Sequence, residues 1–173
     1  MMRENQQKMQ TIHKDNDGNI LEVSPQWAAI VRYCRYQERC HAEVRNKLSE
    51  LGCYATEADE LISRLISDDI LSEERFARLY AGGKFRIKQW GKEKIRNELK
   101  QRRISDYCIR KGLAEIDAED YDKTLEKLTH KKIAELKSEK NQFVKQQKVY
   151  RYLVQKGYER DLALEAIKAG MKK

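Results

Sequence analysis

The chain has 173 residues, of which 40% are hydrophobic, 37% charged and 8% aromatic, with a single proline and a net charge of +8. This composition is too apolar for a disordered chain and is rich in strong helix formers. No apolar run approaches the ~20 residues that cross a bilayer, and the first ten residues lack the apolar core of a signal peptide, so we expect a cytoplasmic protein.

The charge is concentrated in the middle of the chain. Residues 73–114 hold 13 Lys and Arg against 5 Asp and Glu, whereas residues 1–72 carry more acids than bases. Such polarisation favours an acidic or polyanionic partner that meets mainly the middle segment.

The first 25 residues form an acid-leaning arm. Asp17-Gly18 lies between short β-prone runs and is typical of a hairpin turn, so we expect either a small hairpin or a disordered arm. Asp15 and Asp17 lack the spacing of an EF-hand, which favours a plain turn over a calcium site.

A first helical unit is predicted from Ser24-Pro25, because serine as N-cap and proline at the first helical position are strong start signals. The apolar face of this helix comprises Trp27, Ile30, Val31 and Cys34. A later helix of the same unit is predicted to open at Thr56, with Asp59 as its capping-box partner.

A second unit is predicted to start at Ser72, followed by two acids that suit the positive end of a helix. Its predicted inner face comprises Phe76, Leu79, Tyr80 and Ile87. Gly82-Gly83 indicates a break or kink, and Ser105 is expected to cap the last helix of the unit. In a third unit the apolar positions are Leu125, Leu128, Ile133 and Leu136, then Leu162, Ala163, Ala166 and Ile167.

A repeat connects the three units. Leu48, Leu99 and Leu153 each end a helix with an apolar residue four positions earlier, and they are 51 and 54 residues apart. Gly52 and Gly157 fit the left-handed position that closes a helix, whereas Arg103 does not. We therefore predict an all-α fold of three tandem three-helix repeats in an elongated or curved array, spanning 26–71, 72–116 and 117–173 after the 1–25 arm.

No catalytic or ligand-binding motif is recognisable. The three histidines lack partners at ligand spacing, the four cysteines form no C-x-x-C pair, and Ala81–Lys84 lacks the pattern of a phosphate loop. We expect a binding protein rather than an enzyme, with no cofactor and no metal.

The strongest candidate for a binding surface is a basic face in the second unit. On a helix, Lys92, Arg96, Lys100 and Arg103 fall within one quadrant, beside the apolar pair Ile95 and Leu99. The full predicted set is Lys84, Arg86, Lys88, Lys92, Arg96, Lys100, Arg102 and Arg103.

The order of these motifs resembles the RecX family of recombination regulators. The basic motif of that family is matched by ILSEERFARLYAGGKFRIKQWGKEKIRNELKQRRI (70–104), and its first-repeat signature by CHAEVRNKLSELG (40–52). The motif positions are taken by Arg75, Phe76, Ala77, Tyr80, Gly91, Ile95 and Leu99. Cys40 stands where the family usually has a capping serine, and Glu73 replaces an aspartate. The likeness covers roughly residues 26–170.

The resemblance implies tandem three-helix repeats and a role in DNA recombination, repair and the SOS response. RecX-like proteins bind the RecA recombinase, above all its filament on single-stranded DNA, and restrain filament growth, ATPase activity and strand exchange. A monomer that binds the filament, and single-stranded DNA directly or through it, is expected here. Two alternatives remain: a free-standing DNA- or RNA-binding helical module, and an adaptor whose basic face is merely solvated.

Overall fold

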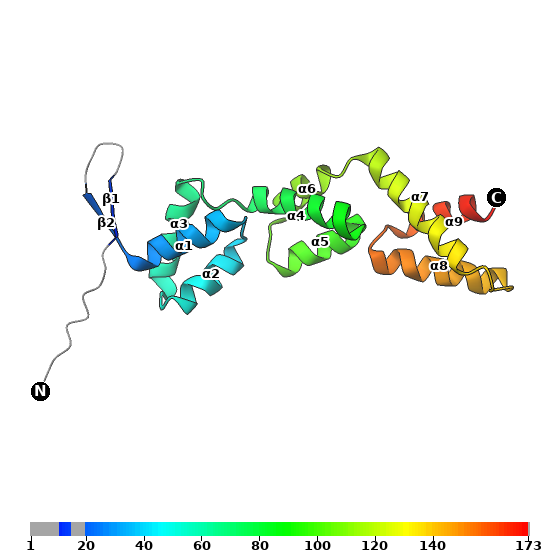
Figure 1. Cartoon of the computed structure of the whole chain (residues 1–173), viewed down its shortest axis with the longest axis horizontal. Coiled ribbons are helices and arrows are strands. Elements are labelled where there is room, and N and C mark those ends of the chain that lie inside the picture. Colours follow the sequence, from blue (N-terminus) through cyan, green and yellow to red (C-terminus); the bar gives the residue numbers. More distant parts are fainter. Residues whose placement is uncertain (1–10, 15–19, 173) are drawn as a thin grey trace, which may run out of the picture. The chain divides into compact units, whose positions relative to one another are not determined.

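The computed structural model describes residues 11–14 and 20–172, and its elements are labelled in Figure 1. Two short strands, β1 (Thr11–Lys14) and β2 (Ile20–Val23), pair antiparallel with Thr11 opposite Val23. The helices of the described residues are α1 (Pro25–Tyr36), α2 (His41–Glu50), α3 (Ala55–Ser67), α4 (Glu73–Lys88), α5 (Lys92–Gln101), α6 (Asp106–Ala114), α7 (Ala118–Glu135), α8 (Gln142–Lys156) and α9 (Arg160–Met171).

The paired strands agree with the predicted hairpin, but its Asp17-Gly18 turn and the acids beside it lie outside the described residues. The all-α fold of three-helix repeats is confirmed by the nine helices that follow in the described residues. Those residues divide into two compact units, one ending at Ser72 and the other beginning at Glu73. The exact repeat boundaries stay predictions.

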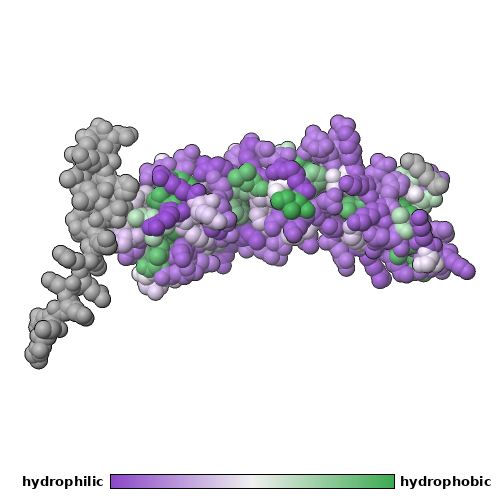
Figure 2. All heavy atoms as spheres, viewed as in Figure 1, coloured by the Kyte–Doolittle hydropathy of each residue, from purple (hydrophilic) through white to green (hydrophobic). Residues whose placement is uncertain are grey.

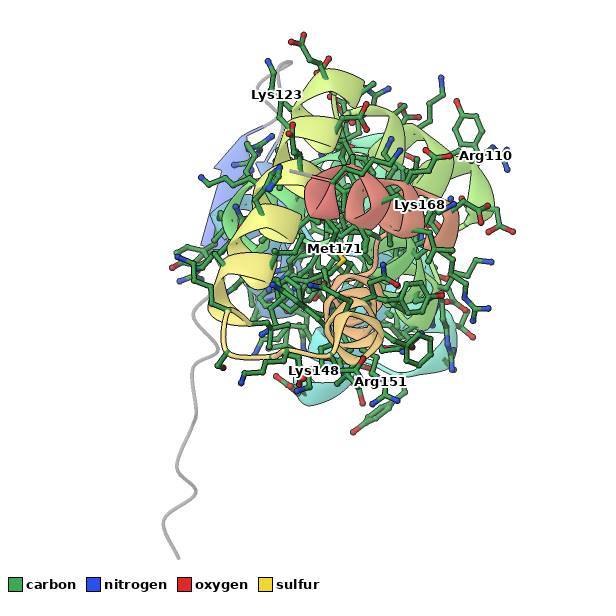
Figure 3. The ribbon with its side chains drawn as sticks, turned by 90° about the vertical axis from the view of Figure 1, so that its right-hand side faces the viewer. Arg110, Lys123, Lys148, Arg151, Lys168 and Met171 are labelled. Carbon is green, nitrogen blue, oxygen red and sulfur yellow. The ribbon has the colours of Figure 1, made fainter. Side chains whose placement is uncertain are left out.

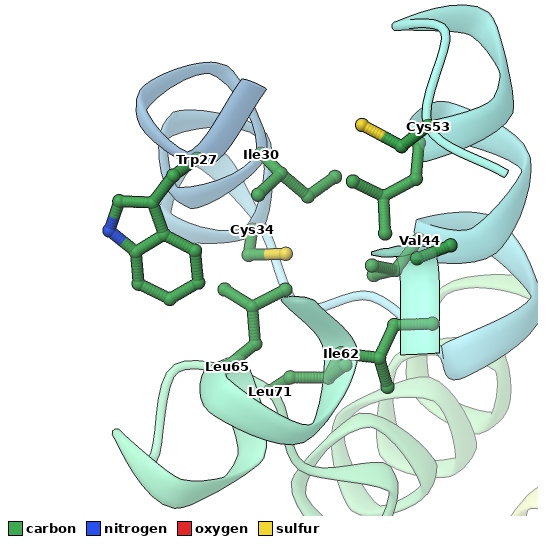
Figure 4. Close-up of a cluster of buried hydrophobic side chains, with 10 residues drawn as sticks. Trp27, Ile30, Cys34, Val44, Cys53, Ile62, Leu65 and Leu71 are labelled. Atoms are coloured by element: carbon green, nitrogen blue, oxygen red, sulfur yellow. The ribbon is translucent and has the colours of Figure 1, made fainter. Parts of the chain in front are cut away.

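The first unit packs α1, α2 and α3 around one apolar core. Figure 4 shows Ile30, Cys34 and Leu65 pointing into the space between the helices, and each is at most 5% exposed. Trp27 is also buried, and Val31 is partly buried against the same core, so the predicted face of α1 is confirmed. Removing side chains of this kind from water is the main stabilising term in so small a unit.

Side-chain caps are found at the starts of α1, α6, α7 and α8, but not at the start of every helix. The Ser24 hydroxyl accepts the amide proton of Trp27 at 3.2 Å, as predicted. By contrast, α3 begins at Ala55 after an N-cap at Tyr54 that lacks a side-chain cap. The predicted capping box with Asp59 was wrong, because that carboxylate pairs with Arg45 at 2.6 Å instead.

The three leucine anchors end their helices in the same way. Leu48, Leu99 and Leu153 are all 0% exposed. The carbonyl of each accepts the amide proton of the residue five positions later, at 2.9, 3.2 and 3.1 Å, from Cys53, Ile104 and Tyr158 respectively. This pairing satisfies a terminal carbonyl of each helix.

The residue before each of these donors has a left-handed backbone. The φ angles are +82° at Gly52, +60° at Arg103 and +92° at Gly157. Arg103 thus adopts the conformation that its side chain disfavours, because the buried Leu99 and Ile104 on either side determine the turn. In the first copy the anchor after the turn is Cys53, 1% exposed, rather than Tyr54, which is 67% exposed.

The predicted inner face of α4 was partly wrong. Leu79 and Ile87 are 57% and 78% exposed, and the buried residues of α4 are Phe76, Ala77, Ala81, Gly82 and Phe85. The cause is the close approach of α6, where a β-carbon on Gly112 would lie 2.6 Å from the Ala77 carbonyl oxygen. Small residues therefore face α6, and the helix runs through Gly82-Gly83 without the predicted break.

The second and third repeats are joined by backbone hydrogen bonds. The amide of Gly91 donates to the Lys156 carbonyl at 2.8 Å, and the amide of Glu93 donates to the Gly157 carbonyl at 3.0 Å. A β-carbon on Gly91 would collide with the backbone of Gly157. The start of α5 is thereby seated on the turn between α8 and α9.

The buried Tyr121 also connects the second and third repeats at this joint. The Tyr121 hydroxyl donates to the Glu159 carboxylate at 2.6 Å and accepts the amide proton of Lys92 at 2.9 Å. The Tyr121 ring also lies 5.0 Å from that of Tyr158 and 5.7 Å from that of Phe85, measured between centroids. Burial raises the pKa of Tyr121, so its hydroxyl stays protonated and remains a donor.

Candidate functional site

All eight predicted cations lie in the second three-helix repeat, which belongs to the compact unit that begins at Glu73. Lys84, Arg86 and Lys88 are on α4; Lys92, Arg96 and Lys100 are on α5; Arg102 and Arg103 follow α5. Figure 2 shows one face of the molecule as mostly hydrophilic with separate hydrophobic spots, as a chain that is 37% charged leads one to expect.

Several of these cations already have partners within the chain. Arg96 forms an ion pair with Glu93, and Arg102 pairs with the Glu98 carboxylate at 3.0 Å. The ammonium of Lys92 lies 4.6 Å from the centre of the Tyr121 ring. The Arg96–Glu93 pair is exposed and worth only about 0.2–1 kcal/mol. Arg102 is partly buried and also donates to the Glu98 carbonyl at 2.8 Å, so it is held more firmly.

Trp90 lies between two lysines. Its ring centre is 5.2 Å from the ammonium of Lys84 and 4.5 Å from that of Lys94. Lys84 also lies 5.0 Å from the ring of Tyr80. Lys94 was not among the predicted residues, although its position two residues after Lys92 made it visible in the sequence.

A second group of cations faces solvent. Arg86, Lys88 and Arg103 are exposed, and within the described part of the chain their side chains make no ion pair. Lys100 is also exposed and has a loose contact with Asp106 at 3.6 Å. The predicted basic face is therefore not one uniform surface: only part of it is available to a partner without breaking an internal contact.

The structure adds basic residues of α7 that the predicted set lacked. Lys123 and Lys127 line a hollow of about 280 Å³ together with Arg86 of α4. Their spacing of four residues was visible in the sequence. Their approach to Arg86 depends on how α7 packs against the end of α4, which no local pattern reveals.

The described residues give no support to a metal centre or to a reactive thiol at Cys34. No group of three or more His, Cys, Asp or Glu is placed to hold a metal ion in that part of the chain. Burial raises the pKa of the Cys34 thiol to about 11, so it remains protonated and unreactive. The described helices also include none long and apolar enough to cross a membrane.

Comparisons with known proteins agree with the repeat architecture. Residues 72–113 match the family described as "RecX, second three-helix domain", and residues 119–167 match "RecX, third three-helix domain". A crystal structure of RecX from Lactobacillus salivarius superposes with a TM-score of 0.77 at 24% identity, covering 87% of this chain and 97% of that one. This likeness supports the fold.

Two relatives are similar in sequence. The regulatory protein RecX of Clostridium perfringens is 33% identical over 120 residues, covering 69% of this chain and 56% of the relative. That of Bacillus thuringiensis is 28% identical over 158 residues, covering 87% of this chain and 58% of the relative. The chain thus spans somewhat more than half the length of these relatives. With its second and third three-helix domains both matched, this chain belongs to the RecX family of regulatory proteins.

Proposed function

We propose that this protein regulates the RecA recombinase by binding its filament on single-stranded DNA. In this role it restrains filament growth, ATPase activity and strand exchange, and it acts in the cytoplasm as a monomer. The observation that carries the proposal is the match of both the second and the third RecX domain to consecutive segments of the chain.

The distribution of charge supports the same function. The 13 basic residues within 73–114 lie in the repeat that bears the predicted contact surface. We propose that the filament meets this surface through Lys84, Arg86, Lys88, Lys92, Arg96, Lys100, Arg102 and Arg103. A cationic surface speeds encounter with a polyanionic filament and needs no enclosed pocket.

The direct test is the ATPase activity of RecA on circular single-stranded DNA, titrated with this protein. We expect a concentration-dependent fall in ATP turnover. The titration is repeated with a severalfold excess of DNA, because a protein that only competes for DNA would lose its effect there. Unchanged ATP turnover at saturating protein would overturn the proposal.

A second candidate is a DNA- or RNA-binding module that acts without a recombinase. The exposed side chains of Arg86, Lys88 and Arg103, which make no ion pair within the described residues, favour it. Phosphate binding alone weakens steeply with salt and persists without RecA. Filter binding of DNA across a salt series, with and without RecA, separates the two functions.

A further inference from the structure

We infer that the hollow between the end of α4 and α7 is a phosphate-binding subsite that takes the backbone of a single nucleic-acid strand. This α4–α7 hollow is lined by Phe85, Arg86, Gln89, Asp120, Lys123, Thr124 and Lys127. The inference rests on the proposed function and deepens it, since it assigns the contact with the strand to residues of two different repeats.

Hydrogen-bond donors dominate the lining. Arg86, Lys123 and Lys127 supply cationic N–H groups, and Thr124 and Gln89 add a hydroxyl and an amide. Asp120 contributes one carboxylate, so three cations face one anion. The cations are exposed, which leaves the hollow open to a chain passing through it. Charge-assisted hydrogen bonds to phosphate are about twice as strong as neutral ones.

The position of Arg86 depends on a glycine. A β-carbon on Gly82 would lie 2.8 Å from Nη1 of Arg86, so the guanidinium folds back over that bare stretch of α4. Any larger residue at position 82 would displace it. Gly82 is buried within the continuous helix α4, and its lack of a side chain leaves room for the Arg86 guanidinium beside the hollow.

The floor of the hollow is held by the joint between the repeats. Phe85 is only 7% exposed and packs on Tyr121. Gln89 has a left-handed φ of +53°, and its carbonyl accepts the Tyr158 hydroxyl proton at 3.4 Å. A non-glycine residue in this conformation persists only where its surroundings hold it. The cations are thus presented from a rigid base.

The chemistry favours a phosphodiester strand over a protein partner. Protein interfaces are usually centred on a buried apolar or aromatic anchor, and the one apolar residue here, Phe85, is already buried by its own chain. Lys123 and Lys127 are one helical turn apart, about 6 Å along the axis, comparable with neighbouring phosphates of an extended strand. The ion pair of Lys123 with Glu119 at 2.6 Å is highly exposed and readily exchanged.

The test is binding of a fluorescein-labelled oligothymidylate to the full chain without RecA. In the triple variant R86Q/K123Q/K127Q we expect affinity at low salt to fall at least about tenfold. The slope of log affinity on log salt should fall by about 2, because each single-strand phosphate contact contributes about 0.7. Circular dichroism confirms that the variant is folded.

A matched control removes three exposed cations elsewhere in the same unit, K140Q/R151Q/K168Q. Figure 3 shows Arg151 and Lys123 on opposite sides of the molecule in that view. The control has the same net charge as the triple variant, but its three residues do not line the hollow. It should therefore lose less than about threefold in affinity and keep most of the salt slope. Equal losses in the two variants would overturn the subsite and leave only a diffuse charge effect.

A variant with the opposite expectation guards against a folding defect. Asp120→Asn removes the single carboxylate of the hollow, and we expect tighter oligothymidylate binding by several-fold. Weaker or unchanged binding would contradict the inference. RecA ATPase inhibition is measured in parallel: if wild type inhibits RecA and the triple variant binds DNA as wild type does, the subsite fails while the proposed function stands. If wild type fails to inhibit, the proposed function fails instead.

Discussion

The same helix-closing turn occurs in both compact units, but it has different surroundings in each. Gly52 and Gly157 both have left-handed backbones and both follow an anchor leucine. A β-carbon on Gly52 would find nothing within 4 Å, whereas one on Gly157 would collide with Lys94 at the start of α5. Gly52 is exposed and Gly157 is buried.

The difference shows that one local motif serves two purposes. In the first unit the turn only ends a helix. In the second unit the turn at Gly157 also supports the preceding repeat, since the amides of Gly91 and Glu93 donate to the backbone of this turn. A joint made of backbone atoms leaves no room for side chains on either glycine, so substitution there should cost far more than in the first unit.

The tryptophans allow each unit to be followed separately. Trp27 lies in the first unit and Trp90 in the second, and the chain has no other tryptophan. Phenylalanine replacement of one tryptophan leaves the other as a reporter of its own unit during urea unfolding.

The largest expected effect is that of Gly157→Ala. The left-handed backbone costs an L residue about 1–2 kcal/mol, and overpacking against α5 adds about 1–3 kcal/mol. We expect the second unit to lose about 2–5 kcal/mol, measured as a lower urea midpoint of Trp90 fluorescence. The urea midpoint of Trp27 fluorescence should not change. A lower midpoint for Trp27 with an unchanged midpoint for Trp90 would contradict the proposed role of the joint.

Tyr121→Phe should have the next largest effect. It removes one hydroxyl from the joint and leaves the Lys92 amide and the Glu159 carboxylate without this partner. A hydrogen bond typically contributes about 0.5–1.5 kcal/mol net, so losing both should cost about 1–3 kcal/mol. The Trp90 transition reports the loss, and Tyr107→Phe, at a residue 54% exposed, is the matched control. Equal stability of the two variants would show that the hydroxyl contributes nothing to the joint.

Gly52→Ala should be milder than its counterpart. With open space around the new methyl group, only the backbone penalty of about 1–2 kcal/mol applies. The change should appear in the Trp27 transition alone. A cost equal to that of Gly157→Ala would remove the distinction between a turn that only ends a helix and a turn that joins repeats.

The smallest effect on stability is expected for Lys88→Gln combined with Arg103→Gln. Both side chains are exposed and make no ion pair among the described residues, so stability should change by less than about 0.5 kcal/mol. If the filament meets these cations, binding to RecA–DNA filaments should weaken about 2- to 30-fold, from about 0.2–1 kcal/mol for each lost contact. Wild-type affinity with an unchanged salt slope would make them solvated surface.

Local patterns in the sequence predicted much of the helical framework. The Ser24 cap and the three leucine anchors depend on neighbours within a few positions along the chain. The charge of the middle repeat follows from its composition alone. The local predictions were wrong where a side chain contacts a different helix. Asp59 was assigned to a cap but pairs with Arg45 of the preceding helix, because an exposed carboxylate can choose among several nearby donors.

By itself, the sequence determined that this chain is a series of amphipathic helices in three related repeats, with its positive charge in the middle repeat. Only the tertiary structure decided which side of α4 is buried, which cations stay free and how Lys123 and Lys127 come to lie beside Arg86. The physical reason is distance along the chain. Periodicity and capping act over one or two turns, whereas the contacts of Gly112 with Ala77 and of Gly91 with Gly157 join residues far apart and depend on the absence of a β-carbon.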